Sequence, residues 1–192
     1  ATGVVLVEPL LQHCIYEDER VQYLHSKMTD LPFEPGTFTH VLIECRCVTQ
    51  SDLATVFSTA KAMLEPGGQL IVNEPIILSN SALPRILGRM IGDTRLNEVV
   101  HQRTAMDIGI EVANAGFEVI QSQSEPEVTQ RLLNKMNQVS MMLKMALRFS
   151  SFDPYSEEFP FTKKELLKAF DEFKAALADE TFGWHSWRAT PN

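Results

Sequence analysis

The fold of this chain is decided by residues 28–75, which read MTDLPFEPGTFTHVLIECRCVTQSDLATVFSTAKAMLEPGGQLIVNEP. The segment contains an apolar run at 40–43, a helical pattern at 52–64 and a second apolar run at 69–72. Two short apolar strands joined by an amphipathic helix are typical of a βαβ unit, in which the strands run parallel within one sheet. We therefore expect an α/β fold built around this unit.

The helix of this unit has recognisable ends and one apolar face. Ser51 or Asp52 is a suitable cap for its start, and the Pro66-Gly67-Gly68 turn is a suitable stop. The residues expected on the buried face are Leu53, Val56, Phe57, Ala60 and Leu64. Their spacing predicts a helix that packs on the sheet along one side.

Composition narrows the class of protein. The chain has 192 residues, 44% of them hydrophobic and 22% charged, which suits one soluble domain with a substantial core. Its net charge of -8 argues against nucleic acid as the main partner, because phosphate binding needs a basic face. Three cysteines form no paired framework, so reduced thiols in an intracellular, cytoplasmic setting are the simpler interpretation. No apolar run approaches the roughly 20 residues of a membrane-spanning helix.

The remaining elements are expected on both sides of the central unit. Strands are expected at 3–7, 21–24, 117–122 and 181–190, and helices at 10–15, 104–115, 125–149 and 162–178. Residues 76–103 form an irregular segment that could cover the sheet as a partial lid. We expect one domain over 1–192: a sheet core at 1–124, a helical insertion at 125–180 and a final strand at 181–192. That last strand is expected to run antiparallel beside Phe117.

Two helices outside the central unit carry specific expectations about packing. In the helix at 104–115, the inward residues are expected to be Met106, Ile110, Val112 and Ala113, with Gly116 closing the helix. In the helix at 125–149, the leucines and methionines are expected to pack into the core; the alternative is a soft binding wall, which methionine suits. The apolar residues concerned are Leu132, Leu133, Met136, Val139, Met142, Leu143, Met145 and Ala146.

Two acidic residues follow successive strands. Glu8 comes directly after GVVLV, and Asp30 follows the strand that contains VQYL. In an open α/β sheet, ligands bind beyond the carboxyl ends of the strands, where an acid commonly accepts hydrogen bonds from ribose hydroxyls. A second acid one strand away can accept from an adenine amino group. Each acid alone is equally compatible with a helix cap or a turn, but the pair predicts an adenosine site.

Several motifs now point to a family. The segments Glu8-Pro9-Leu10, Asp30-Leu31-Pro32-Phe33, Pro35-Gly36-Thr37-Phe38 and Leu64-Glu65-Pro66-Gly67-Gly68-Gln69-Leu70 resemble those of class I S-adenosylmethionine-dependent methyltransferases, type 11-like. A weaker likeness continues through Ala115-Gly116-Phe117. The resemblance implies a Rossmann-like, mostly parallel sheet whose last strand is antiparallel, and S-adenosylmethionine as cofactor.

The resemblance also implies residue roles. Glu8, with Pro9 beside it, would hold the cofactor ribose, and Leu10 would pack on the adenine. Asp30 would accept from the adenine amino group, with the Leu31 backbone beside it. Glu44, Cys45 and Arg46 would lie where methyl donor and acceptor meet. Since the sulfonium is already activated, positioning does most of the work, and a base such as His101 is needed only if the acceptor must lose a proton. No metal site is expected.

One family feature is missing from the chain. No Gly-x-Gly sequence occurs among its residues, although the family places one after its first strand. GVVLV therefore fits the second strand better than the first, and the first strand would separate Val5 from Leu42. Three explanations stay open: an upstream segment is missing from a chain that begins Ala-Thr-Gly, another element fills the slot, or the two strands pair directly and the cofactor site is degenerate.

Two functions follow from this sequence. The first is a methyltransferase that acts on a small-molecule acceptor. The second is a non-catalytic, methyltransferase-like scaffold or subunit, with a protein partner or a second copy of the chain as its binding partner. A Gly-x-Gly within roughly 20 residues before Gly3 would favour the enzyme.

Overall fold

A computed structural model describes residues 2–5, 22–26, 30–45, 47, 50–78, 101–149 and 162–192. The strands are β1 Thr2–Val5, β2 Gln22–His25, β3 Phe38–Glu44, β4 Leu64–Ile77, β5 Phe117–Ser124 and β6 Phe182–Pro191. The helices are α2 Leu53–Met63, α4 Ala105–Asn114, α5 Pro126–Phe149 and α6 Lys163–Ala178. The expected helix at 10–15 and most of the expected lid lie outside the described residues.

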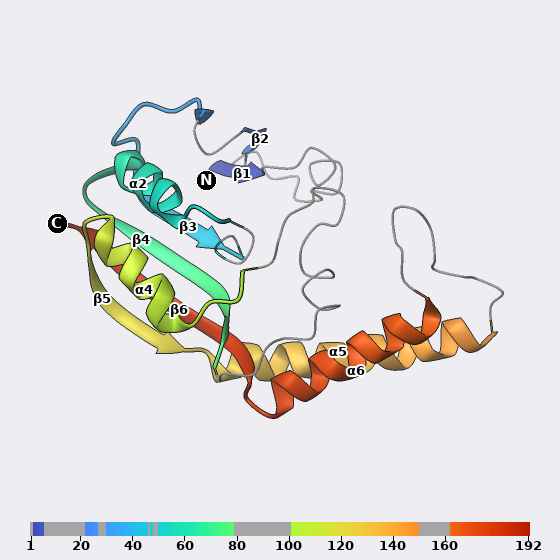
Figure 1. The fold of residues 1–192 in the computed structure, drawn as a ribbon. Helices are drawn as coiled ribbons and strands as arrows, with labels where there is room; N and C mark the ends of the chain where they lie inside the picture. The colour runs from blue at the N-terminus through green and yellow to red at the C-terminus, as the bar shows by residue number, and fades with distance from the viewer. Residues whose placement is uncertain are drawn as a thin grey trace.

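The strands form an α/β architecture with two sheets (Figure 1). β1 and β2 pair in parallel, and a second sheet has the order β3-β4-β6-β5. β3 and β4 are parallel, whereas β6 runs antiparallel to both of its neighbours. The expectation of a Rossmann-like sheet with an antiparallel last strand beside Phe117 is confirmed.

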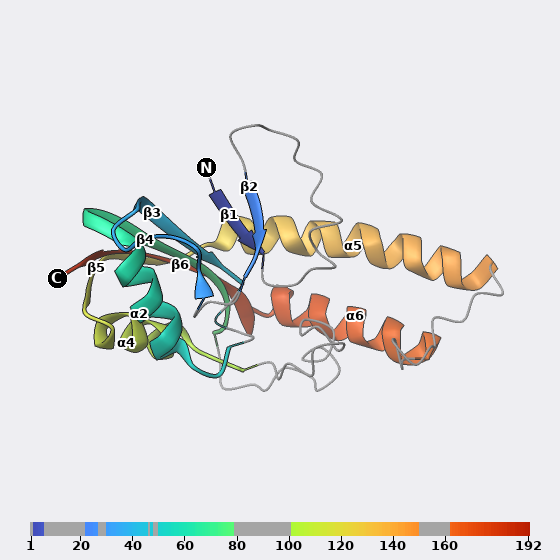
Figure 2. The same ribbon diagram turned by 90° about the horizontal axis from the view of Figure 1, so that it is seen from above.

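β1 and β3 belong to different sheets, at the place where a further strand was expected to separate them. Figure 1 shows the β1–β2 pair beyond the β3 edge, and Figures 1 and 2 both show β1 and β3 pointing in the same direction. Among the described residues β1 and β3 are not hydrogen-bonded neighbours. Direct pairing of these strands, one of the three explanations, is therefore wrong for the described part of the chain.

The connection from α2 to β4 is tighter than the sequence suggests. Asp52 caps α2 by accepting from the Thr55 backbone nitrogen at 3.0 Å, and the helix runs to Met63. β4 starts at the next residue, and its pairing with β3 shifts register between Phe38 and His40. Gly67 has a φ of +81°, which favours glycine. β4 therefore extends beyond the strand expected at 69–72 at both ends.

The far end of β4 owes its length to pairing with β6. Residues 73–77 continue the antiparallel ladder, with Glu74 opposite His185 and Ile77 opposite Phe182. The hydrogen bonds of this ladder keep the chain extended beyond Val72, although Pro75 suggests a break. Glu74 therefore lies near the carboxyl end of β4.

The main core lies between the second sheet and the helices α2 and α4, which cover one of its faces (Figures 1 and 2). The buried residues of α2 are those expected from its apolar face. In α4, however, the buried residues are Ile108 and Val112, while Met106 and Ile110 are 73% and 51% exposed. Ala113 is exposed as well, so the expected inward face of α4 is wrong except at Val112.

A second, smaller core joins the sheet to α5 and α6. Ile77 and Phe182 from the strands pack with Ala169 and Leu177 of α6. The two helices lie side by side and extend away from the sheet (Figures 1 and 2). Part of α5 contributes to this core as expected, through Leu132, Leu133 and Met136. No helix in the described ranges has the length and apolarity needed to cross a membrane.

The outer half of α5 does not pack as expected. Val139, Met142 and Met145 are 38%, 65% and 55% exposed, and Met141 is 61% exposed. These side chains lie on the side of α5 that α6 does not cover, because one helix can bury only one stripe of another. The expectation of core packing is wrong for these positions.

Replacing Thr104 by alanine is expected to lower the free energy of unfolding by about 1 kcal/mol, because Thr104 caps α4. Its hydroxyl accepts from the Asp107 nitrogen at 3.2 Å, and the Asp107 carboxylate accepts from the Thr104 nitrogen at 2.8 Å. The bond from the Thr104 nitrogen, followed by one that the Thr104 hydroxyl donates to the same carboxylate, lowers the pKa of Asp107. The contribution of Asp107 is therefore present above the ordinary carboxyl pKa and is lost as the pH falls through the lowered value. Urea denaturation at pH 7 and pH 3 measures both effects; equal stability of variant and wild type at pH 7 would contradict them.

Candidate functional site

The loop after β2 presents the first predicted site residues. Asp30 is exposed and Leu31 is partly buried. The Ser26 hydroxyl donates to the Asp30 carbonyl oxygen at 2.7 Å, and the Gly36 nitrogen donates to the Ala62 carbonyl at 2.9 Å. The loop is therefore tied to β2 at its start and to α2 near its end, and the Asp30 carboxylate faces solvent.

The next two predicted site residues lie at the tip of β3. Glu44 and Cys45 are both exposed. Cys45 has a φ of 54°, the left-handed region that a non-glycine residue seldom adopts. Its nitrogen donates to the Asn73 carbonyl oxygen at 3.1 Å, which holds the turn against β4. A backbone of this kind persists where surrounding contacts hold it, and such residues cluster at active sites and ligand clamps. Glu180, just after α6, has a similar φ of 53°.

A buried polar group lies behind this tip, and sequence reasoning missed it. Glu74 and Cys47 are both 0% exposed, and Glu74 forms a side-chain hydrogen bond with the Cys47 thiol. The sequence signal for this group was the acid Glu74 beside the apolar run around Val72. A charged residue is almost never fully buried without a partner, so an acid in such a run indicates a buried polar contact.

Arg103 belongs to the same group, and no sequence pattern predicts its role. Its guanidinium donates to the Gln50 carbonyl at 2.7 Å, and its own carbonyl accepts from the Ile77 nitrogen at 2.9 Å. The Arg103 charge also acts to lower the pKa of Cys47. Arg103 thus connects the segment after β3 with the end of β4, two elements that lie side by side in the sheet.

Both thiols are expected to react slowly with iodoacetamide at pH 8. Desolvation, followed by the Glu74 and Glu44 carboxylates, raises the pKa of Cys45 to about 12, and desolvation followed by Glu74 raises that of Cys47. Since only the thiolate is nucleophilic, the folded protein should alkylate far more slowly than the urea-unfolded protein. A Cys14→Ser background isolates the two cysteines. Equal rates in folded and unfolded protein would contradict the raised pKa values of the two thiols.

His101 lies two residues before Arg103, and its side chain is partly buried. Burial, and then the charge of Arg103, lowers the pKa of His101. The imidazole is therefore neutral at pH 7 and able to accept a proton. The other predicted site residues, Glu8, Pro9, Leu10 and Arg46, lie outside the described residues.

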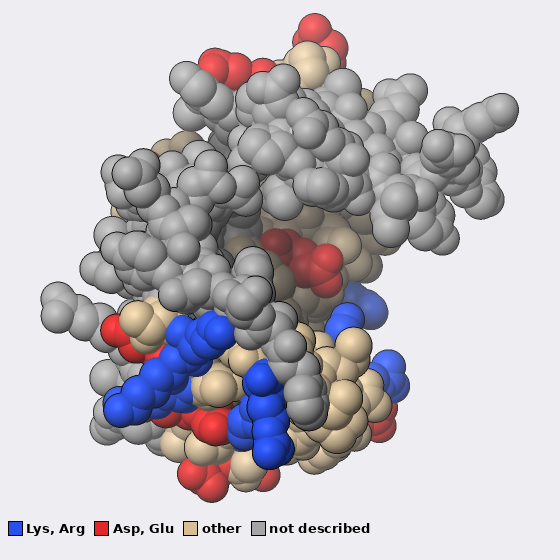
Figure 3. Space-filling model, turned by 90° about the vertical axis from the view of Figure 1, so that its right-hand side faces the viewer, with Lys and Arg blue, Asp and Glu red and all other residues tan. Residues whose placement is uncertain are grey.

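Acidic side chains lie on the side of the molecule toward which β1 and β3 point. Figure 3, which views this side, shows acidic side chains inside a hollow. Exposed Asp30 and Glu44 are acceptors for amino and hydroxyl groups. The chain has no Gly-x-Gly with which its backbone could approach the methionine part closely. In the described part, no group of three or more His, Cys, Asp or Glu side chains is placed to hold a metal ion.

Comparisons with known proteins agree with this architecture. A family model described as "Methyltransferase domain" matches residues 1–72. The fold is similar to that of phosphoethanolamine N-methyltransferase 2 from Haemonchus contortus, solved with S-adenosyl-L-methionine, with a TM-score of 0.68 and 17% identity over 99% of this chain and 43% of that one. It is also similar to the [4+2]-cyclase SpnF, with a TM-score of 0.64 and 17% identity over 99% of this chain and 66% of that one. Comparison with curated protein sequences gave no match.

These matches confirm the resemblance seen in the sequence: the fold is that of class I methyltransferases, and residues 1–72 carry the methyltransferase-domain pattern. The chain spans less than two thirds of both solved structures. At 17% identity the likeness concerns the fold, and one fold supports different chemistries.

Proposed function

We propose that the chain forms a class I methyltransferase-like domain that binds S-adenosylmethionine and acts on a small-molecule acceptor. The observation that carries this proposal is the strand order, with antiparallel β6 between β4 and β5, in a chain whose first 72 residues match a methyltransferase family. The solved methyltransferase with the same fold was obtained with S-adenosyl-L-methionine.

The chain's own residues would bind the cofactor at the carboxyl edge of the strands. Asp30 accepts from the adenine amino group, with Leu31 beside it, and Glu8 accepts from the ribose hydroxyls. When bound, S-adenosylmethionine supplies a methyl group that its sulfonium has already activated. Glu44 and Cys45, at the tip of β3, lie where the acceptor approaches. His101, neutral at pH 7, accepts a proton from acceptors that must lose one.

Calorimetric titration with S-adenosylhomocysteine tests this proposal. We expect heat of binding and a rise in melting temperature, because a ligand that binds only the folded state stabilises it. Adenosine alone should bind more weakly and still compete for the same site. The absence of both heat and thermal shift would remove the enzyme proposal.

A second candidate is a non-catalytic scaffold, favoured by the absence of a Gly-x-Gly sequence and of pairing between β1 and β3 among the described residues. In that case the open strand edges take up a protein partner, because unpaired edges are templates for further strands. A protein that forms a stable complex but binds no S-adenosylhomocysteine would support this candidate over the first.

A further inference from the structure

A groove runs along one flank of the α5–α6 pair, away from the sheet. It has a volume of about 320 Å³, and α5 supplies most of its lining. The lining residues that matter for its chemistry are Ser140, Met141, Lys144, Met145, Arg148 and Lys174. Figure 3 shows Lys and Arg side chains, with Asp and Glu side chains among them, in the lower half of this side of the molecule, where α5 ends and α6 begins.

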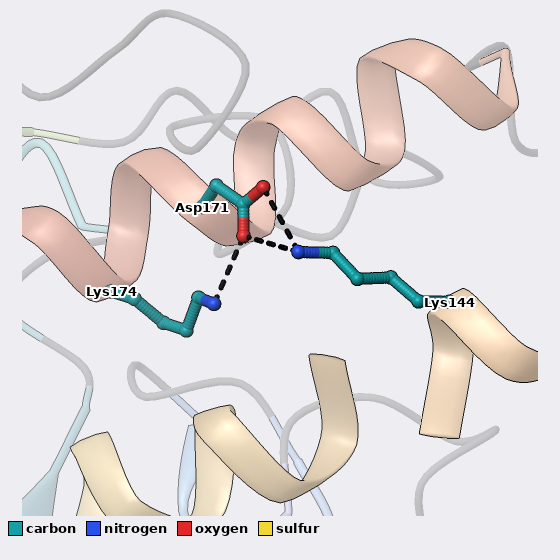
Figure 4. Close-up of polar contacts among 3 residues, drawn as sticks. All are labelled: Lys144, Asp171 and Lys174. Carbon is teal, nitrogen blue, oxygen red and sulfur yellow. Dashed lines mark hydrogen bonds and ion pairs between the residues drawn. The ribbon is translucent and has the colours of Figure 1, made fainter. Parts of the chain in front are cut away.

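The charge of the groove is opposite to that of the whole chain. Lys144, Arg148 and Lys174 line it, and no carboxylate is among the described lining residues, whereas the net charge of the chain is -8. Asp171 approaches from α6: its carboxylate lies 3.1 Å from the Lys144 ammonium and 2.9 Å from that of Lys174 (Figure 4). Among the described residues, two ammonium groups share this one carboxylate, which leaves one positive charge at the pair of lysines.

These cations are partly ordered before any ligand arrives. The Lys174 side chain is only 21% exposed, and it shares Asp171 with Lys144, which comes from the other helix. The two lysines are therefore held close together at one place (Figure 4). Pre-positioned cations lose less side-chain freedom when an anion binds.

A buried hydroxyl on the same wall has no partner. Ser140 is 1% exposed, and its Oγ makes no hydrogen bond in the described part of the structure. Buried hydroxyls are nearly always hydrogen-bonded, so this one is a donor that a ligand oxygen could satisfy. Its position one helical turn before Lys144 places it on the same flank of α5.

Two further lining residues are apolar and exposed, and a third is the polar Asn137. Met141 and Met145 are 61% and 55% exposed, and they are one helical turn apart on α5. Methionine is flexible and polarizable, so such a wall adapts to aliphatic groups of different shape. The groove thus combines a cationic end with an apolar side.

From this combination we infer that the α5–α6 groove binds a phosphate monoester attached to an apolar chain. The phosphate lies against Lys144, Lys174 and Arg148, because Arg and Lys are the usual partners of phosphate oxygens. The Ser140 hydroxyl donates to one phosphate oxygen, and the chain lies along Met141 and Met145. The source of the phosphate is a soluble metabolite or a lipid headgroup.

Calorimetric titration of the 192-residue chain with monomeric octyl phosphate tests the inference. We expect saturable binding of one molecule, stronger than that of octanol or inorganic phosphate. Lys174→Glu should weaken it by at least about tenfold, because it reverses the charge at the phosphate position. The matched control is Lys168→Glu, since Lys168 is 71% exposed, lies on the same helix and does not line the groove. The control should bind like the wild type.

Ser140→Ala separates binding from folding. It should weaken octyl phosphate binding several-fold while leaving the melting temperature of the free protein unchanged or higher, because an unpartnered buried hydroxyl is removed. Vesicles of phosphatidylcholine with phosphatidic acid identify the source: binding that the same variants abolish assigns a lipid headgroup, and no vesicle binding assigns a soluble ligand. Failure of octyl phosphate to saturate, or equal weakening by Lys174→Glu and Lys168→Glu, would overturn the inference.

Discussion

Replacing Trp187 by alanine is expected to lower the free energy of unfolding by about 3–5 kcal/mol, as for other large core aromatics. Trp187 is 2% exposed and lies on β6, between β4 and β5, facing the core that α2 and α4 cover. Its ring lies 4.4 Å from that of His185. Because whole domains are stable by only about 5–15 kcal/mol, this loss should leave part of the protein unfolded at 37 °C.

Trp184→Ala provides the matched control for this prediction. Trp184 lies on the same strand but on the opposite face, and it is only partly buried. Trp184→Ala should therefore lower the free energy of unfolding by less than Trp187→Ala does, because less apolar area returns to water. Urea denaturation followed by circular dichroism measures both variants. Equal losses, or a larger loss at Trp184, would show that the core lies on the other face of the sheet.

Asp30→Asn is expected to weaken S-adenosylhomocysteine binding by about 10- to 100-fold, the usual loss when a charged hydrogen-bond acceptor is removed. The change is nearly isosteric, and Asp30 is exposed, so the protein should unfold with unchanged cooperativity. The loss arises because the carboxylate is replaced by a neutral amide that accepts less strongly from the adenine amino group. Calorimetric titration gives the two affinities.

Glu34→Gln controls for the loss of one negative charge from the same loop. Glu34 is exposed and precedes the Pro35-Gly36 turn, four residues from Asp30. Glu34→Gln should change the affinity for S-adenosylhomocysteine by less than about twofold, because a solvent-exposed charge outside the site contributes little. Unchanged affinity in Asp30→Asn, or equal losses in both variants, would remove Asp30 from the site.

The sequence predicts the sheet well because its strands have strong local signals. The apolar runs of β3, β4 and β6 and the caps of α2 and α6 appear at the expected places. The phase of α4 was not predictable, because its apolar residues occupy several faces and only contact with the sheet selects Ile108 and Val112. Likewise, the length of β4 depends on pairing with β6, more than a hundred residues later in the chain.

The candidate site was only partly predictable. Motifs at strand ends predict Asp30 and Glu44 as site residues, because the order of elements brings such ends to one edge, and both assignments stay predictions. The Glu74–Cys47 hydrogen bond and the contacts of Arg103 depend on tertiary packing between segments distant in sequence. The α5–α6 groove depends on which side of α5 remains uncovered. Hydrophobic periodicity predicts that α5 is a helix, but it does not predict which element packs against it.

Hydrogen–deuterium exchange with and without S-adenosylhomocysteine tests the central claim most directly, which is that the carboxyl edge of the strands holds the adenosine. We expect slower exchange in peptides covering residues 30–33 and 44–50, because ligand contacts and less frequent local unfolding protect the backbone amides there. Exchange in α5 and α6 should stay the same. Protection confined to α5 and α6, or no change at the strand ends under saturating ligand, would contradict the account.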